Sequence, residues 1–487
     1  MNAYMKYIKW AVFVLVTILA ISLSLYKASS DFKREVSNDE RNWTAVSISS
    51  YEMYFKGHQR PNVVMDSWFY TYAIENGIDT AAMTPDQKQW YDFAMWTFGW
   101  KAPNLGKYIM GAYVAANADI ELDKNGYYEK GRADMQEDTN IYYSRVPEEL
   151  IYLARKPNAW MNGLAIGLVF LTGWFFLNYW SGLIAAIYLL LNKVYFSVNV
   201  AAGLDSPSIF FWVLAVFFLM ANIRYILNRE KLWKTLLLAL ATGIMFGAAV
   251  ASKLNAAMFG YVCAIVFPLA GLAIVMDKSK SEKGVPFFKS ALGSRLTTLV
   301  ISGLIIAITG PALFVKLNPQ VQGDTVTKVK VIQLSVDEFF KRRANSQIAK
   351  NRQARKVLTE VTFKKRDKAF SLIVRRNLFV EDSEKYYGTF GNLLKFKGNF
   401  LDGLFVLIGL VGMLWVGFVK FRKEKRINGE WIILISFAVM LYGMAGFIWI
   451  DFARYHMAIY PGMALAVGYG ISLLIQLGMK RFGKQTV

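Results

Sequence analysis

Long apolar runs recur along this sequence, and each is close to the length that crosses a lipid bilayer. An α-helix rises about 1.5 Å per residue, so roughly 20 apolar residues cover the roughly 30 Å hydrocarbon layer. Ten runs are predicted to be transmembrane helices, over residues 10–26, 159–177, 181–201, 207–227, 234–251, 254–276, 296–317, 400–419, 430–450 and 455–478. The fold class predicted is therefore an all-α polytopic membrane protein.

Clusters of Lys and Arg predict how the chain is oriented. Basic residues near the ends of spans are retained in the cytoplasm. With ten spans, the basic clusters all fall on one side, at 229–234, 278–295, 420–426 and 480–484. We therefore expect an integral protein of the cytoplasmic (plasma) membrane with both termini in the cytoplasm. The first run is interpreted as a retained helix rather than a cleaved signal peptide, because it is long enough to span.

This topology leaves two long segments outside, residues 27–158 and 318–399. The predicted organisation is an N-terminal transmembrane catalytic module, 1–317, then the basic loop 318–399, then C-terminal helices over 400–487. The basic loop carries 18 Lys and Arg against 8 Asp and Glu, against the charge rule, but long loops translocate largely regardless of charge. An amphipathic pattern over 336–350 suits either an anionic membrane surface or a solvated basic face packed on the loop.

Composition limits the classes of function. The net charge of +21 is explained by the basic flanks of the spans, so nucleic acid is not expected as a partner. Cys263 is the single cysteine and the chain has two histidines, which excludes a disulfide within the chain and a multi-histidine metal centre. No cofactor is clearly indicated. A divalent cation, if used, would be a hard ion held by carboxylates, with Asp39 and Glu40 as the candidate ligands.

Ionisable residues gather at the outer ends of the predicted spans. Asp39 and Glu40 open the first outer segment, and a carboxylate there suits a general base toward an acceptor hydroxyl. The other pocket candidates are Trp43, Lys101, Lys107, Asp205, Lys253, Arg454, Tyr455 and His456. Each charge alone is typical of a snorkelling anchor at a span end. Together at one face they favour a pocket for a charged ligand such as a lipid phosphate.

The order of these motifs resembles a known family. One span is followed by an outer loop that opens with Asp39-Glu40, then Pro103-Asn104-Leu105-Gly106-Lys107 and Leu204-Asp205-Ser206-Pro207. Ser252-Lys253 and Arg454-Tyr455 complete the series. This order is similar to that of GT-C type membrane glycosyltransferases, in the branch of protein O-mannosyltransferases and lipid A aminoarabinose transferases (ArnT-like). The resemblance covers most of the chain through short motifs.

The resemblance implies a transferase that moves a sugar from a polyprenyl-phosphate carrier to an acceptor on the non-cytoplasmic face. It implies Asp39 as the catalytic carboxylate with Glu40 beside it, and Lys107, Lys253 and Arg454 facing the donor phosphate. The transferred group would be a hexose or a pentose, as in cell envelope glycosylation. The expected partners are a polyprenyl-phosphate-linked sugar, membrane lipids and a glycan, lipid or protein acceptor. The family commonly has a His or Lys before two prolines where this chain has Ala102-Pro103-Asn104. That departure leaves the acceptor class and the metal site open, and Lys101 is the candidate substitute.

Two other functions use the same residues. A transporter or flippase for a lipid-linked sugar would need the cations without covalent chemistry, but transporters tend to hold charges near the bilayer midplane on broken helices. The span interiors here are nearly free of charge. A non-catalytic relative acting in binding or assembly is the third hypothesis.

Overall fold

The computed structural model describes residues 3–29, 36–56, 102–120, 133–135, 142–144, 146–277, 290–330, 332–334, 389–394, 400–447 and 457–482. Most of these residues are helical. The elements at the end of the molecule opposite the termini are helices α2 (Asn38–Phe55) and α5 (Leu105–Asn117) and a hairpin of strands β1 (Ala133–Met135) and β2 (Tyr142–Ser144). The all-α class is thus confirmed, with one short antiparallel hairpin that the sequence patterns did not predict.

Eight helices of the described chain are long and apolar enough to cross a membrane. They are α1 (Ala3–Ala28), α6 (Glu148–Phe176), α9 (Asp205–Asn228), α10 (Leu232–Ser252), α11 (Phe259–Met276) with the 3₁₀ turn Leu254–Met258, α12 (Ala291–Leu317), α16 (Phe400–Glu424) and α18 (Tyr460–Phe482). The polytopic membrane class is confirmed by these helices.

The two remaining predicted spans differ from straight helices. The run 181–201 forms α7 (Tyr179–Leu191) and α8 (Lys193–Val200), which bend by 71° and give a ninth span if counted as one. Asn192 causes the break: its side chain accepts the Tyr195 N–H at 2.8 Å and so starts a new helix. The last, α17 (Gly429–Phe447), is a shorter apolar helix, so the exact number of ten stays a prediction.

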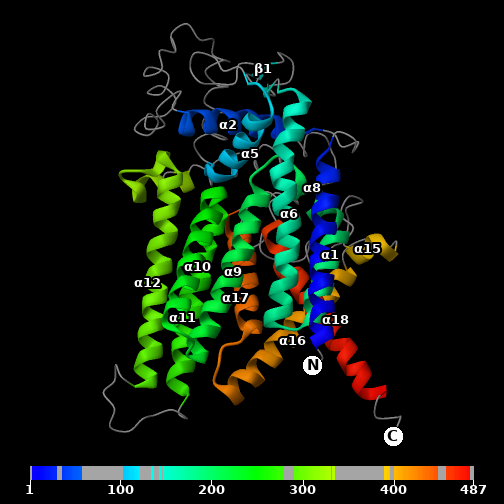
Figure 1. Cartoon of the computed structure of the whole chain (residues 1–487), viewed down its shortest axis with the longest axis vertical. Coiled ribbons are helices and arrows are strands. Elements are labelled where there is room, and N and C mark those ends of the chain that lie inside the picture. The colour runs from blue at the N-terminus through cyan, green and yellow to red at the C-terminus, as the bar shows by residue number, and fades with distance from the viewer. Residues whose placement is uncertain are drawn as a thin grey trace, which may run out of the picture.

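Most of the span helices run along the long axis of the molecule, whereas α16 crosses it obliquely, and the start of α1 and the end of α18 lie at the same end (Figure 1). Helices α2 and α5 lie at the opposite end, and α2 runs across the bundle. The described helices of the first long segment thus lie at the end opposite the start of α1 and the end of α18. Which end faces the cytoplasm stays a prediction.

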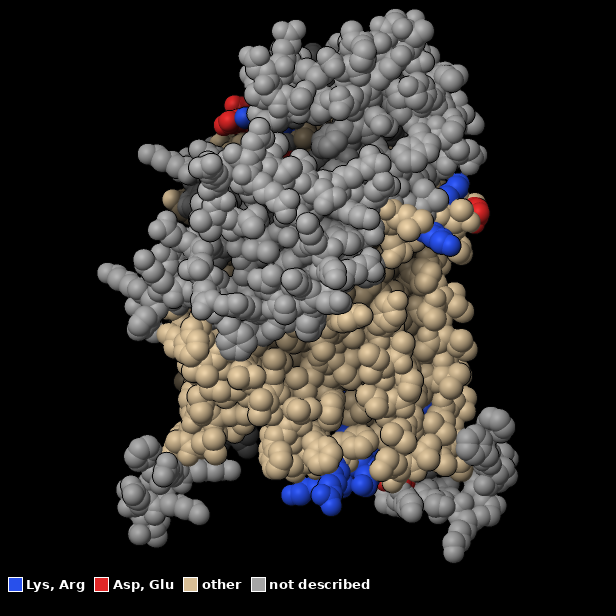
Figure 2. All heavy atoms as spheres, turned by 180° about the vertical axis from the view of Figure 1, so that it is seen from behind, with Lys and Arg blue, Asp and Glu red and all other residues tan. Residues whose placement is uncertain are grey.

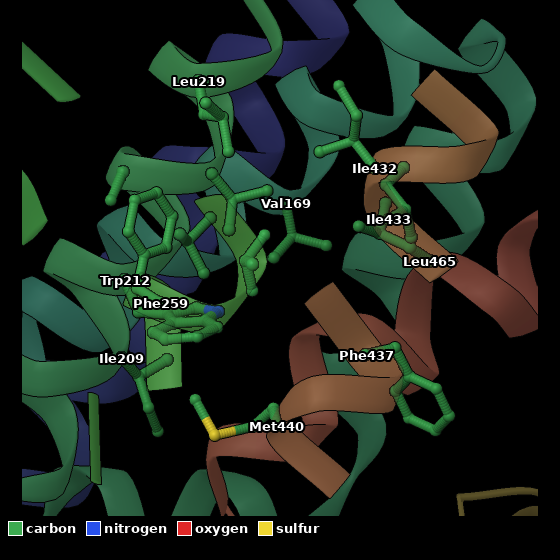
Figure 3. Close-up of a cluster of buried hydrophobic side chains, with 14 of the residues drawn as sticks. Val169, Ile209, Trp212, Leu219, Phe259, Ile432, Ile433, Phe437, Met440 and Leu465 are labelled. Atoms are coloured by element: carbon green, nitrogen blue, oxygen red, sulfur yellow. The ribbon is translucent and has the colours of Figure 1, made fainter. Parts of the chain in front are cut away.

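Two hydrophobic clusters hold these parts together. The larger lies among the spans, where Val169 of α6, Trp212 of α9, Phe437 of α17 and Leu465 of α18 line an apolar cavity (Figure 3). The smaller cluster joins α2 and α5 to the start of α6 through Ile48, Met110, Val114, Val146, Leu150, Ile151, Ala154, Ala202 and Leu204. The side chains of the smaller cluster are shielded from water by one another rather than by lipid. Their burial therefore fixes α2 and α5 on the end of the bundle.

Candidate functional site

The predicted Asp39-Glu40 motif lies in the first turn of α2. Ser37 caps this helix: its hydroxyl accepts the Glu40 N–H, and the Glu40 carboxylate accepts the Ser37 N–H at 3.2 Å. This reciprocal pair is a capping box, which fixes the helix start. Asp39 is half-buried beside it. The α2 N-terminus therefore holds both carboxylates at a defined position on the end of the bundle.

Glu40 is buried, with 2% of its surface exposed, and it forms a two-pronged ion pair with Arg155 of α6. Arg155 Nε donates to Oε1 at 2.7 Å and Nη2 donates to Oε2 at 2.9 Å. Oε1 also accepts the Ala202 N–H at 3.0 Å. One carboxylate thus connects α2, α6 and the turn between α8 and α9.

This geometry does not fit Glu40 as a metal ligand, because both of its oxygens already accept from Arg155 and from the backbone. Across the part of the chain that the structure describes, no three His, Cys, Asp or Glu side chains are grouped as a metal ion would require. The contacts hold Glu40 in the same helix turn as Asp39. Arg155 Nη1 is buried and has no hydrogen-bond partner among the described residues.

Arg41 and Trp43 anchor the same helix turn. Arg41 Nη1 donates to the Val146 carbonyl at 2.8 Å, and its Nη2 forms an ion pair with Glu148 at 3.2 Å. Trp43 is partly buried against the smaller hydrophobic cluster. Both side chains therefore secure α2 on the segment that leads into α6.

Lys107 lies on α5 and is fully buried. Desolvation lowers the pKa of its ammonium to about 7. The preceding residue, Gly106, packs so closely that a Cβ there would lie 2.8 Å from a Leu204 methyl and 3.5 Å from the Pro207 ring. Gly106 therefore packs against Leu204. Because Lys107 follows Gly106 and Asp205 follows Leu204, the structure brings these two predicted positions to one place.

The turn before α5 carries the departure from the family motif, and it is anchored to the end of α12. The Asn104 N–H donates to Asn318 Oδ1 at 2.8 Å, and Asn104 Nδ2 donates to Gln320 Oε1 at 2.6 Å. Gln320 belongs to a 3₁₀ turn, Pro319–Val321, directly after α12. Asn104, where the family has proline, therefore makes contacts that a proline lacks the groups to make.

Asp205 and Lys253 form an ion pair with each other. Asp205 begins α9 and Lys253 follows α10, so the pair joins the start of one helix to the end of the next. Their side chains are 21% and 23% exposed. The sequence motifs give Asp205 and Lys253 as separate pocket positions, whereas the structure pairs them.

Two further polar residues of the site, Asn158 and Arg155, are not among the residues that the sequence motifs predict. Asn158 Nδ2 donates to the carbonyls of Ala201 at 2.6 Å and Gly203 at 2.9 Å, and the Asn158 backbone carbonyl accepts from Ser206 Oγ. Arg155 lies one turn earlier on α6. Because the apolar run begins at 159, the sequence predicts both positions in the outer segment 27–158. The helix in fact begins at Glu148, and its polar first turns extend beyond the apolar run.

Four predicted pocket residues lie outside the described residues, namely Lys101, Arg454, Tyr455 and His456. The described platform consists of Asp39, Glu40, Lys107, Arg155, Asn158, Asp205 and Lys253. It combines a half-buried carboxylate with buried or paired cations at one end of a membrane bundle. Such a set can bind a phosphate and activate a hydroxyl.

Residues 125–310 match the model of the family described as dolichyl-phosphate-mannose-protein mannosyltransferase. The resemblance stated from the motif order is confirmed over that segment. It contains Arg155, Asp205 and Lys253. No match was found among curated proteins.

Solved structures of membrane glycosyltransferases are similar to this chain at low identity. The S. cerevisiae protein O-mannosyltransferase Pmt1-Pmt2 complex bound to the sugar donor matches with 15% identity and a TM-score of 0.42, over 65% of this chain and 35% of that chain. The Archaeoglobus fulgidus oligosaccharyltransferase AglB matches with 13% identity and a TM-score of 0.49, over 100% and 52%. ArnT from Cupriavidus metallidurans, bound to undecaprenyl phosphate, matches with 13% identity and a TM-score of 0.46, over 95% and 60%. The chain thus spans 35% to 60% of the length of these proteins.

Proposed function

We propose that this protein is a membrane glycosyltransferase that transfers a sugar from a polyprenyl-phosphate donor to an acceptor hydroxyl, with Asp39 as the catalytic carboxylate. The observation that carries the proposal is the platform at the end of the bundle opposite the termini. There the Asp39 turn is clamped by Glu40 and Arg155 close to the segment that holds Lys107 and Asp205. This end would face the outside of the cell.

The chemistry divides between the carboxylate and the cations. As the bond from the sugar to the donor phosphate breaks, negative charge grows on the phosphate and is stabilised by cations in place beforehand. Lys107 and Lys253 are the described candidates, and Arg454 is the third. The acceptor hydroxyl loses its proton to Asp39, and its oxygen forms the new bond to the sugar while the phosphate leaves.

The Glu40–Arg155 pair has a positioning role in this proposal. Because Glu40 is adjacent to Asp39 in the first turn of α2, its bonds to Arg155 and Ala202 restrict where Asp39 lies relative to α6 and the α8–α9 turn. General-base catalysis needs the base within hydrogen-bond reach of the hydroxyl.

Purified full-length protein in detergent, incubated with a panel of labelled polyprenyl-phosphate hexoses and pentoses, tests the proposal. Wild type should consume a donor and release the polyprenyl phosphate. Asp39→Asn should reduce kcat by roughly 10² to 10⁴. Asp119→Asn is the matched control, because Asp119 is an exposed carboxylate just after α5 at the same end. Equal turnover by wild type and Asp39→Asn would remove Asp39 from the catalytic role.

The rival functions give different results. A transporter or flippase would move a labelled lipid-linked sugar across a vesicle membrane without consuming it. A non-catalytic relative would bind the donor and neither move nor consume it. We favour the enzyme because the described cations, Lys107 and Lys253, lie at the end of the bundle, whereas transporters hold their charges near the midplane.

A further inference from the structure

Two residues of the described chain other than glycine have a left-handed backbone, and both are basic. Arg229 has φ +59° and Lys425 has φ +51°. Arg229 directly follows α9, and Lys425 directly follows α16. The left-handed conformation is disfavoured for residues with a Cβ, so a helix that ends this way usually has glycine or asparagine there.

The end of α9 illustrates the point. The Glu230 N–H donates to the Tyr225 carbonyl at 3.0 Å, across the left-handed Arg229, as in a Schellman motif. Glycine would form the same motif without strain. Attraction to the helix dipole does not require charge at these strained positions, since Arg422 and Lys423 already place cations in the last turn of α16 with ordinary helical geometry.

The two strained turns form one surface. Arg426 Nη1 donates to Asn228 Oδ1 at 3.2 Å, which joins the α16–α17 turn to the α9–α10 turn. Residues 222–234 and 420–430 contain nine Lys and Arg against three Glu. Of the three, Glu230 and Glu424 are exposed, and Glu430 is buried and paired with Lys420 at 2.6 Å. We call the residues of these two turns, 228–231 and 422–426, the basic turn pair.

The basic turn pair lies at the end of the bundle that also holds the termini, and Figure 2 shows Lys and Arg side chains gathered at that end of the described surface. Neither the Arg229 guanidinium nor the Lys425 ammonium has a hydrogen bond or ion pair with another described residue. Beside them α10 begins with the exposed side chains Leu232 and Trp233, 53% and 61%. Apolar side chains next to unpaired cations fit the boundary between acyl chains and headgroups.

We propose that the basic turn pair is a binding site for the headgroup of an anionic phospholipid, with Arg229 and Lys425 as its principal cations. Arg229 is exposed and Lys425 is half-buried at the two helix ends, and the Arg426–Asn228 hydrogen bond holds these ends together. A lipid phosphate would bind between them, and its acyl chains would pack on the apolar start of α10. The site is at the opposite end from the proposed catalytic platform, so it is independent of the transferase proposal.

Thermal unfolding of the full chain in neutral detergent, with phosphatidylglycerol or phosphatidylcholine titrated in, tests this site. Phosphatidylglycerol should raise the Tm of wild type, and phosphatidylcholine should not. One Lys or Arg near an anionic membrane surface changes affinity roughly fivefold. The half-saturating phosphatidylglycerol concentration should therefore rise roughly fivefold for Arg229→Gly and roughly 25-fold when Lys425→Gly is added.

Three controls separate charge, strain and position. The double glycine variant should unfold at the same temperature as wild type or higher without lipid, because the strain is gone. The double alanine variant keeps the strained backbone and loses the charge. It should therefore respond to lipid as the double glycine variant does, but unfold at a lower temperature than that variant. Lys330→Gln, an exposed lysine beyond α12 near the other end, should respond like wild type. Wild-type lipid response in both double variants would overturn the proposal. So would equal stabilisation by phosphatidylcholine or by soluble glycerol phosphate.

Discussion

Replacing Arg155 with methionine would test whether the buried ion pair holds the catalytic turn in place. The pair has side-chain exposures of 0% and 3%, and its two hydrogen bonds are 2.7 and 2.9 Å long. Removing one partner of a buried pair costs roughly 3–5 kcal/mol, because the other charge is left without its counter-ion. Glu40 would still accept the Ala202 and Ser37 N–H groups. We therefore expect a loss near the lower end, about 3 kcal/mol.

The assay is denaturant unfolding in micelles at a fixed detergent concentration, with a matched pair as control. Arg41–Glu148 joins the same two segments, but its side chains are 25% and 51% exposed. Exposed pairs are screened by water, so Glu148→Gln should cost less than about 1 kcal/mol. The double variant Glu40→Gln with Arg155→Met removes both charges and should regain at least about 1 kcal/mol over Arg155→Met alone. If Arg155→Met lowers the free energy of unfolding no more than Glu148→Gln does, the Glu40–Arg155 ion pair does not hold the start of α2 in place.

Three further predictions concern the rest of the platform. Burial lowers the pKa of Lys107 to about 7, while the unfolded chain keeps that proton to about 10.4, so stability should rise with pH between these values. Lys107→Met should flatten the increase of the free energy of unfolding between pH 7 and pH 10. An unchanged slope would contradict the lowered pKa of Lys107. Asp205→Asn should strengthen donor-phosphate binding, because the negative charge next to Lys253 is removed, whereas Lys253→Met should weaken it. Titration with polyprenyl phosphate measures both affinities, and a change of the same sign in both would exclude Lys253 as a phosphate ligand. At the α2–α5 crossing, a Cβ on Gly111 would lie 2.1 Å from the Ser47 carbonyl oxygen, so Gly111→Ala should cost roughly 1–3 kcal/mol in the same unfolding assay, and a neutral result would mean that the helices separate freely.

The positions of the membrane spans, and the end of the bundle at which the charged residues gather, follow directly from the sequence. A bilayer span needs about 20 consecutive apolar residues whatever surrounds them, so spans can be recognised one at a time. The run at 254–276 was separated correctly from 234–251, and the chain breaks at Lys253 as expected. Alternation of spans then brings Asp39, Lys107, Asp205 and Lys253 to one end without any knowledge of packing.

Local breaks were harder to predict, because they depend on single polar side chains. The apolar run 181–201 has the composition of a straight span, yet Asn192 bends it by 71°. The apolar run predicts a span that begins at 159, whereas the helix begins at Glu148. Periodicity and hydropathy detect apolar faces, so a helical turn that is polar because it lies beyond the membrane is not detected.

The partners of the site residues were decided by tertiary structure alone. Glu40 and Arg155 are 115 residues apart, and Asn104 and Gln320 are 216 apart. Whether two such side chains meet depends on how each helix is rotated and offset against its neighbour, and that follows from packing across the whole bundle. The sequence by itself therefore determined that charged residues collect at one end of a membrane bundle. Only the folded chain decided that Glu40 is held by Arg155 and that Asp205 pairs with Lys253, because long-range contacts are set by packing.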